Sequence, residues 1–425
     1  MAKIEPFRAL IYNPGETNDL SSVVCPPYDV ISPAQQQYYH DLNPHNFIHI
    51  LLGKDIPGED KYRRAAYLFK EWQKNKILNP DRSPAIYFYS QQYNIKGEKK
   101  TRLGFIARLY LEDKKTAIYG HEHTRLEPKE DRLKLLKSVK ANLSPIFVIF
   151  SDKKRIISGI NQHIQDEKPF IDIVDKEKVN HRLWRLDSPD ILDSIKSKMQ
   201  NESIFIADGH HRYEVSCIYR DEMRKKLGGS AQEADFDYTL AYFTNTNPGG
   251  LTILPIHRLI KLDHRLDMEN FRENIKDFFE MEEIKDRTRF FFLLAKGGQS
   301  EHALGMYYDK KYWLLRLKNI KILDKIISDK PHSVRSLDVS ILNHLIFKKA
   351  MGMGAGDQEN IAYSPHAQEL IDRVDSDNTY IAFFLNPVKI QQIISVALTG
   401  QKMPPKSTYF YPKVLSGLVI NKHGD

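Results

Sequence analysis

The sequence predicts a mixed α+β fold, and three observations lead to this prediction. Several segments place apolar residues at helical spacing, others are short runs of β-branched and aromatic residues, and no internal repeat is present. The chain has 425 residues, which is enough for two or three domains. With 41% hydrophobic and 28% charged residues, its composition is typical of globular proteins and excludes disordered and fibrous classes.

The first part of the chain alternates helical and strand patterns. In order, we expect a helix over 61–72, strands over 85–91 and 103–109 around a turn at 96–98, a basic amphipathic helix over 132–139, and a buried strand over 146–150. A clear strand–turn–helix unit follows. It consists of a strand over 203–207, the turn Asp208-Gly209, and a helix over 210–226 that ends before Gly228.

The remaining chain mixes strands and helices. We expect strands over 238–245, 251–259, 290–294, 302–308, 312–317 and 380–385, helices over 268–279, 337–349 and 388–398, and a flexible loop at the glycine-rich patch 352–356. This order suggests a phosphate-binding core over 1–265, a small α+β insertion over 266–320, and a C-terminal α/β segment over 321–425 that returns to the core.

Charge and cysteine content limit the partners. The formal net charge is +8, but the cations are scattered among 55 acidic residues, which favours a mixed surface with an anion site over a nucleic-acid surface. Two cysteines are too few for a disulfide framework. The apolar runs are far shorter than the ~20 residues that span a bilayer, so we expect no membrane partner and a cytoplasmic location.

The turn Asp208-Gly209-His210-His211-Arg212 is the first candidate site. A glycine turn leads into a helix N-terminus, where backbone N–H groups and the helix dipole attract anions. Two imidazoles and a guanidinium in the first turn add donors that suit phosphate oxygens. Asp208 can bind a metal ion, or it can simply cap the helix.

The second candidate is Gly120-His121-Glu122-His123-Thr124-Arg125. Two histidines around a glutamate can bind a metal, and the glutamate can act as a base. The alternative is a surface turn in which Thr124 caps a helix, with Glu127 three residues later as in a capping box.

Two proline-containing segments complete the candidates. Pro26-Pro27 fixes an extended backbone that can present Tyr28 and Asp29 rigidly, or can serve as a structural loop. Lys406-Ser407-Thr408 offers one cation and two hydroxyls for phosphate, although it lacks the glycines of a P-loop; the alternative is a basic loop.

The order of these segments resembles the uncharacterised family called domain of unknown function 1015. The resemblance extends from about Phe7 to Val419 and rests on five motifs, CPPYDVIS, GHEHT, ADGHHRYE, LPIHR and MPPKSTYFYPK. Within it, Asp208–Tyr213 is similar to the phosphate-binding turn of the ParB/sulfiredoxin-like superfamily. That similarity implies a core of the same kind.

Three members of that superfamily suggest different functions. Sulfiredoxins need a cysteine in this turn, where the present chain has His210-His211. Partition proteins bind CTP and carry a DNA-reading helix-turn-helix, which this sequence does not clearly show. Free-serine kinases have Asp-Gly-His-His-Arg or a near variant in the turn, so the resemblance implies phosphoryl transfer to free L-serine or a similar small hydroxyl compound.

The kinase prediction assigns roles to the candidate residues. Asp208, His210 and Glu122 are expected to be catalytic, with Glu122 as the base and Asp208 as the ligand of a Mg²⁺ cofactor or of the substrate's amino group. The phosphate-binding residues are expected to be Gly209, His210, His211, Arg212, Lys406, Ser407 and Thr408. The substrate-binding residues are expected to be Tyr28, Asp29, His121, His123 and Thr124. The donor is diphosphate, ATP or ADP; the alternatives are a ParB-like nucleotide-binding regulator with DNA as partner, and a phosphoserine phosphatase.

Overall fold

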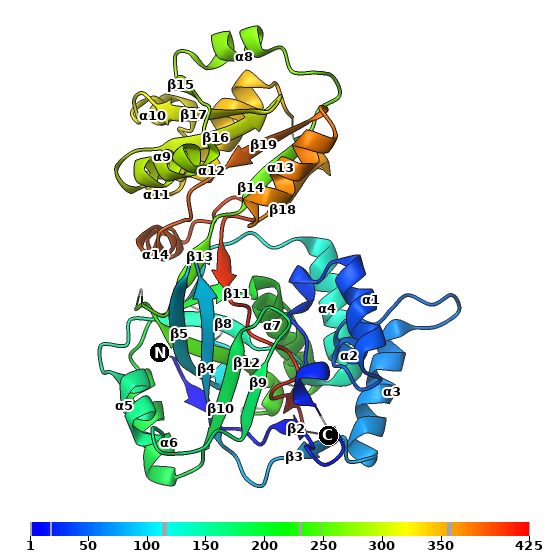
Figure 1. The fold of residues 1–425 in the computed structure, drawn as a ribbon. Coiled ribbons are helices and arrows are strands. Elements are labelled where there is room, and N and C mark those ends of the chain that lie inside the picture. The colour runs from blue at the N-terminus through cyan, green and yellow to red at the C-terminus, as the bar shows by residue number, and fades with distance from the viewer. Residues whose placement is uncertain are drawn as a thin grey trace. The chain divides into compact units, whose positions relative to one another are not determined.

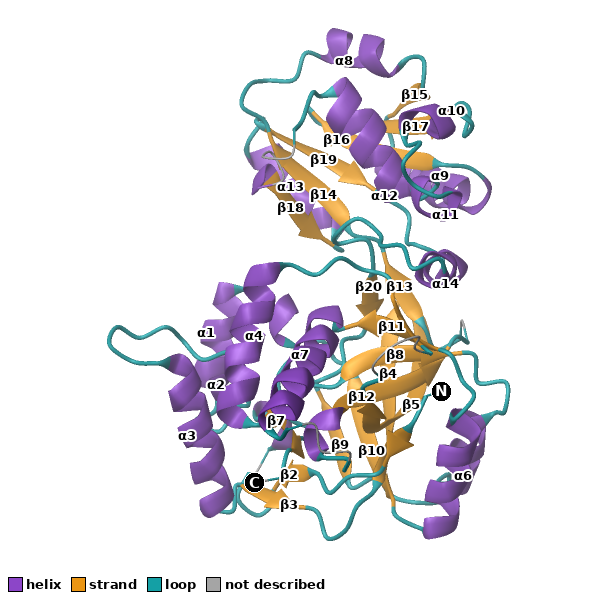
Figure 2. Ribbon diagram, turned by 180° about the vertical axis from the view of Figure 1, so that it is seen from behind, coloured by secondary structure: helices purple, strands orange, loops and turns teal. Residues whose placement is uncertain are grey.

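The computed structural model describes residues 2–17, 19–112, 117–228, 232–247, 249–354 and 359–424. The fold is mixed α+β, as predicted (Figures 1 and 2). The chain divides into two compact units. The first unit comprises Met1–Gly120, Thr124–Thr252 and Pro412–Asp425, and the second comprises His121–His123 and Ile253–Tyr411.

A nine-stranded mixed sheet forms the centre of the first unit. Its order is β6 (Ile118–Gly120), β11 (Ile204–Asp208), β8 (Ile146–Phe150), β12 (Tyr238–Asn245), β5 (Glu98–Tyr110), β4 (Ile86–Ile95), β10 (Asn180–Leu186) and β9 (Ile171–Val174), with β1 (Ile4–Glu5) added to β5. The β11–β6 and β12–β8 pairs are parallel, and the other pairs are antiparallel. Strand β8 is buried along its whole length, as its five apolar residues predict.

Helices cover this sheet on both sides. Figure 1 shows α5 (Ile156–His163) and α6 (Pro189–Met199) to one side, and the other helices of the unit opposite them. Those other helices are α1 (Pro33–Leu42), α2 (Ile48–Leu51), α3 (Lys61–Lys74), α4 (Leu126–Val139) and α7 (His210–Lys226). One apolar core lies between the sheet and α5–α6, and a second gathers side chains from α2, α3 and α4.

The second unit is built on a six-stranded antiparallel sheet. Its order is β15 (Phe279–Ile284), β17 (Lys311–Leu317), β16 (Ala303–Tyr308), β19 (Tyr380–Phe384), β14 (His257–Lys261) and β18 (Ile361–Ser364). One core packs the sheet against α8 (Met268–Ile275) and the π-helix η4 (Leu342–Ala350). The other packs it against α9 (Arg287–Ser300) and α13 (Ala367–Ser376).

Shorter elements complete both units. The helical ones are η1 (Leu20–Ser22), η2 (Tyr28–Val30), η3 (Asp235–Asp237), α10 (Ile322–Ile326), α11 (His332–Arg335), α12 (Asp338–Ile341) and α14 (Ile390–Leu398). Three two-stranded ladders pair β2 (Leu10–Tyr12) with β3 (Leu78–Pro80), β7 (Ala141–Asn142) with β21 (Asn421–Lys422), and β13 (Thr252–Leu254) with β20 (Tyr409–Tyr411).

Most of the predicted elements are confirmed, and one is wrong. The run 290–294 was expected to be a strand but lies inside helix α9. A short apolar run does not distinguish a buried strand from a buried helix. Here the Asp286 carboxylate accepts a hydrogen bond from Arg289 N at 2.6 Å and starts a helix. The predicted helix over 268–279 ends at Ile275, and the predicted strand over 251–259 is divided between β13 and β14.

The two units have bounds that differ from the expected boundaries at 265 and 320. The reason is that β14 pairs with β18 and β19. The six-stranded sheet therefore combines the strands of the range 266–320 with strands that come before and after that range. In the glycine-rich patch, residues 352–354 form a loop, as expected, and Ala355 and Gly356 lie outside the described residues. Over the described part of the chain, no helix is both long and apolar enough to cross a membrane.

Candidate anion site at the start of helix α7

Gly209 connects strand β11 to helix α7 in a conformation that requires glycine. Its φ is +87°, in the left-handed region that side-chain-bearing residues avoid. A Cβ at this position would lie 2.9 Å from the guanidinium carbon of Arg212. The glycine therefore allows both the sharp turn and the packing of Arg212 against it.

Two cations surround the carboxylate of Asp208. Lys413 Nζ lies 2.7 Å from Oδ1, and an Arg212 terminal nitrogen lies 2.9 Å from Oδ2. Burial alone raises the pKa of Asp208, but the charges of Lys413 and Arg212 outweigh it and hold the pKa well below its usual range. The carboxylate is therefore ionised, and the three side chains together keep one net positive charge.

Arg212 is held from several directions. Besides Asp208, it donates to the carbonyl oxygen of Pro145, and its side chain is 12% exposed. Its Nε is buried without a hydrogen-bond partner among the described residues. The guanidinium is thus fixed beside the turn with donor capacity left over.

The start of α7 presents its positive end at the same place. The hydrogen-bond ladder of the helix begins with Tyr213 N donating to Gly209 O, so the N–H groups of the first turn point out along the helix axis. Gly209, the N-cap residue, supplies no side-chain cap. Asp208 is therefore not the helix cap that was one interpretation of the sequence, because its carboxylate binds cations instead.

The two histidines of the turn have different environments. Arg125 N donates to His211 Nε2 at 2.9 Å, so this nitrogen carries a lone pair and the ring is neutral with its proton on Nδ1. His211 therefore adds no positive charge to the turn. His210 is buried, and it is a further influence that lowers the pKa of Asp208.

Thr124 binds Glu214 rather than capping a helix. Its Oγ1 donates to Glu214 Oε2 at 2.6 Å, and Lys129 Nζ lies 3.2 Å from the same oxygen. Helix α4 instead begins after Arg125, without a side-chain cap. The alternative interpretation, a capping box at Thr124, is therefore wrong, and the threonine joins the loop before α4 to helix α7.

Tyr28 lies near the turn, and its assignment as a substrate-binding residue stays a prediction. It lines a small cavity of about 60 Å³ together with Arg212, Ser216 and Arg132. The Arg132 guanidinium lies 4.3 Å from the Tyr28 ring centroid, and burial raises the pKa of Tyr28 well above its usual range. Asp29, the next residue, is exposed.

In the second unit, two other predicted segments contact one another. His121 Nε2 lies 3.3 Å from Thr408 Oγ1, and Met403 N donates to His121 O at 2.7 Å. Lys406 N approaches Glu122 Oε1 at 3.5 Å. The histidine–glutamate–histidine segment and the lysine–serine–threonine segment are thus neighbours, separated by more than 280 positions in the sequence.

The side chains in these two segments differ in exposure. Lys406 is exposed and has a φ of +57°, whereas Ser407 is buried and donates from Oγ to Pro404 O at 2.5 Å. His123 is exposed. The association of Glu122 with the Asp208 turn, which belongs to the first unit, stays a prediction.

Sequence reasoning missed two charged residues of the α7 site. Lys413 follows an aromatic run and Pro412, and its place as the last residue of the motif MPPKSTYFYPK was the available signal. Glu214 lies one turn into α7 and is visible in the sequence only as an ordinary helical glutamate. Both were missed because the pairing of charges far apart in the chain depends on the fold.

The Asp208 carboxylate does not fit the role of a magnesium ligand. Both of its oxygens already accept hydrogen bonds from cations, and Mg²⁺ needs carboxylate or water oxygens that are open to it. Among the described residues, no group of three or more histidine, cysteine or acidic side chains could hold a metal ion.

Comparison with known proteins places the chain in a family. Residues 4–340 match the family described as "Protein of unknown function (DUF1015)", and the chain belongs to it. No curated protein matches. The predicted membership of this family is thereby confirmed. Four of the five motifs lie within the matched residues, whereas MPPKSTYFYPK lies beyond them.

Several solved structures are similar to this chain at low sequence identity. A free serine kinase in complex with AMP is 11% identical, with a TM-score of 0.33, over 69% of this chain and 83% of the kinase. SbnI from Staphylococcus aureus is 11% identical, with a TM-score of 0.36, over 73% and 85%. A conserved hypothetical protein from Pyrococcus furiosus is 12% identical, with a TM-score of 0.32, over 70% and 89%.

Proposed function

We propose that this protein is a small-molecule kinase that transfers a phosphoryl group to the hydroxyl of free L-serine or a similar compound. The observation that carries the proposal is the net positive charge of Asp208, Arg212 and Lys413 at the start of helix α7. A helix N-terminus beside a guanidinium and an ammonium suits phosphate oxygens. The tight turn at Gly209 lets a phosphate approach the backbone closely.

The donor phosphates would bind across this turn. Backbone N–H groups from Gly209 to Arg212 would contact the phosphate oxygens, and Arg212 and Lys413 would offset the charge that develops in transfer. Asp208 acts as a positioning residue, since it holds both cations in place. Because His211 is neutral, it would contribute a hydrogen bond rather than a charge.

The acceptor hydroxyl would attack the terminal phosphorus of the donor. Glu122 would take the hydroxyl proton as the new P–O bond forms, and the bond to the leaving phosphate or nucleotide breaks with its electron pair. Asp29 is the next candidate for the base. We propose that serine is held by residues among Tyr28, Asp29, His121, His123 and Thr124, and that a second phosphate or the serine carboxylate is held by Lys406, Ser407 and Thr408.

A magnesium requirement remains part of the proposal. Since the oxygens of Asp208 are engaged by Lys413 and Arg212, the ion would be carried by the phosphate oxygens of the donor. Omitting Mg²⁺ with each donor in turn tests this point.

The experiment is incubation of the full chain with serine, Mg²⁺ and ATP, ADP or diphosphate, followed by mass-spectrometric detection of phosphoserine. We expect product, and a loss of about a hundredfold or more in Asp208→Asn, because Arg212 and Lys413 lose the carboxylate that holds them in place. Asp221→Asn is the matched control, since Asp221 also pairs with an arginine of α7 but is 65% exposed.

Each outcome discriminates between functions. Absence of phosphoserine with all three donors contradicts the kinase. Release of phosphate from added phosphoserine without any donor identifies the phosphatase alternative. Retention on DNA that falls steeply with salt, in the absence of kinase activity, identifies the partition-protein alternative.

A further inference from the structure

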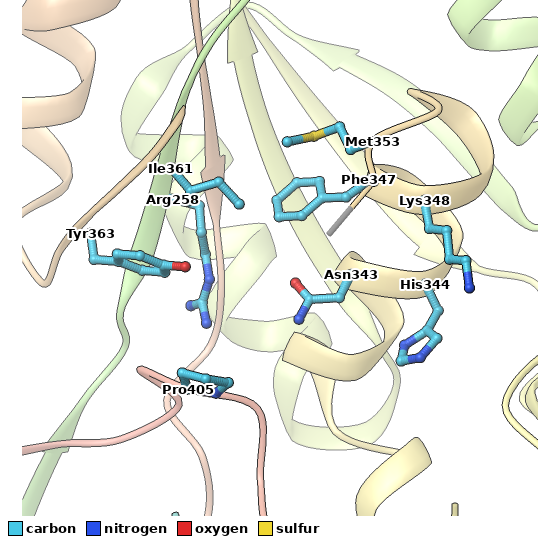
Figure 3. Close-up of a pocket in the computed structure, with 10 residues that line it drawn as sticks. Arg258, Asn343, His344, Phe347, Lys348, Met353, Ile361, Tyr363 and Pro405 are labelled. Atoms are coloured by element: carbon cyan, nitrogen blue, oxygen red, sulfur yellow. The ribbon is translucent and has the colours of Figure 1, made fainter. Parts of the chain in front are cut away.

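A pocket lies entirely in the second unit, and its lining includes none of the residues assigned to the proposed kinase site. It has a volume of about 310 Å³, which is within the range of small-molecule sites. Figure 3 shows its walls, formed by β14, β18, the π-helix η4 and the loops beside them. Its lining residues are Arg258, Asn343, His344, Phe347, Lys348, Met353, Gly354, Ile361, Tyr363 and Pro405. We call it the Arg258 pocket.

Arg258 is a buried charge without an acidic partner. Its side chain is only 2% exposed, and it donates to the carbonyl oxygens of Ile256 and, at 2.9 Å, Lys406. No carboxylate of the described residues pairs with it. Burial lowers the pKa of Arg258 to about 10, so the group stays charged at neutral pH. A buried cation with only neutral acceptors is costly, and an anion in the pocket would offset that cost.

The other polar groups of the pocket complement an anion. The Arg258 guanidinium lies 5.4 Å from the Tyr363 ring centroid, and Figure 3 shows the Tyr363 hydroxyl and the Asn343 amide pointing toward the pocket interior from opposite walls. Lys348, which is exposed, also lines the pocket. None of the described lining residues is acidic.

A π-helix supplies one wall. Four lining residues, Asn343, His344, Phe347 and Lys348, come from η4, and π-helical turns are rare and are found frequently at functional sites. His344 Nδ1 lies 2.8 Å from the carbonyl oxygen of Ser340, so the proton sits on Nδ1 and the ring is oriented by that bond. The widened helix therefore presents polar and aromatic side chains together on the pocket side.

The remaining surface is apolar. Phe347, Met353 and Ile361 line the part of the pocket above the polar groups in Figure 3. We propose that the Arg258 pocket binds a small organic anion, with its phosphate or carboxylate group at Arg258, Tyr363 and Asn343 and a flat or aliphatic body against Phe347, Met353 and Ile361. This site is additional to the phosphate site at helix α7.

The test uses phenyl phosphate, benzoate and the neutral benzyl alcohol as probes, with affinity measured by calorimetry on the full chain. We expect one or both anions to bind and benzyl alcohol not to bind; the better anion identifies the head group. Tyr363→Phe and Asn343→Asp should each weaken that anion by about tenfold or more, because each removes or opposes a hydrogen bond to a charged group.

Two controls separate this site from others. Lys349→Ala removes an exposed ammonium from the same helix that does not line the pocket, so it should leave affinity unchanged, whereas Lys348→Ala should weaken binding. Arg212→Ala should also leave it unchanged. The proposal is overturned if Arg212→Ala loses binding while Asn343→Asp binds fully. It is also overturned if neither anion binds to the unaltered protein. The proposed kinase activity would be unaffected by that result.

Discussion

At the scale of single residues, the pairing of Asp208 with Lys413 gives the first prediction. In Lys413→Met, the Asp208 carboxylate loses one of the two cations that bind it and keeps Arg212. We expect the affinity for the phosphate donor to fall by about tenfold or more, and the stability by about 1–3 kcal/mol. Donor titration and chemical unfolding measure the two effects.

Lys422→Met is the control for that variant, since Lys422 is an exposed lysine of the same C-terminal segment. Equal donor affinity in Lys413→Met and the unaltered protein would remove Lys413 from the anion site.

A buried histidine gives a prediction about acid stability. Burial lowers the pKa of His257 to about 3, from 6.5 in the unfolded chain. Between these values the unfolded state binds a proton that the folded state does not bind, so the free energy of unfolding falls as the pH falls below about 6.5. The expected slope is about 1.4 kcal/mol per pH unit.

The measurement compares the free energy of unfolding at about pH 7 and about pH 5. Unfolding is monitored by the fluorescence of Trp313 in a Trp72→Phe, Trp184→Phe background, because Trp313 belongs to the second unit, as His257 does. His257 Nδ1 accepts a hydrogen bond from Leu385 N at 3.2 Å. In His257→Asn, the side-chain oxygen can accept this bond from Leu385 N but does not titrate. This variant should lose the slope; an unchanged slope assigns the acid sensitivity to other groups.

The candidate residues show how far a sequence can predict a site. The Asp208–Arg212 turn was predictable because its strand, glycine and helix are consecutive, so local rules suffice. The charge state of His211 was not predictable, since it depends on a bond from Arg125 N, 86 positions away. Lys413 was missed for the same reason, being 205 positions from the carboxylate it pairs with.

At the scale of elements, the β11–α7 turn predicts a specific effect of replacing its glycine. Gly209→Ala combines a positive φ with a Cβ 2.9 Å from the Arg212 guanidinium. We expect a loss of stability of about 1–3 kcal/mol and weaker donor binding, because Arg212 must move. Thermal melting and donor titration provide the readouts.

Gly228 is a matched position at the other end of the same helix. Its φ is +65°, but a Cβ there would meet nothing within 4 Å. Gly228→Ala should therefore show the backbone strain alone, with unchanged donor affinity. If both variants lose donor affinity to the same extent, displacement of Arg212 is not the cause.

The error at α9 has a physical explanation at this scale. Phe290–Leu294 is uniformly apolar, so its periodicity does not distinguish the two kinds of element. The environment in the structure does distinguish a helix from a strand. Phe290 and Leu294 are one helical turn apart, and both enter the core on one face of the six-stranded sheet. Strands such as β8 and β12 were predictable because their apolar runs are bounded by turn residues.

At the scale of the whole molecule, the second unit has its own sheet and a core on each face of it. We expect residues 253–411 to fold alone, with a cooperative transition by circular dichroism and dispersed amide resonances. A fragment that binds a hydrophobic dye and melts without cooperativity would show that this unit depends on the rest of the chain.

The discontinuity of the first unit affects how the protein is made. Its chain leaves at Thr252 and returns at Pro412, so Asp208 is synthesised long before Lys413, the cation that lies 2.7 Å from it. On the ribosome, strand β11 and helix α7 emerge early, but the Asp208 carboxylate cannot pair with Lys413 until nearly the whole chain has been made. The proposed anion site is consequently completed last, and a nascent or truncated chain that stops before Pro412 lacks one of its two cations.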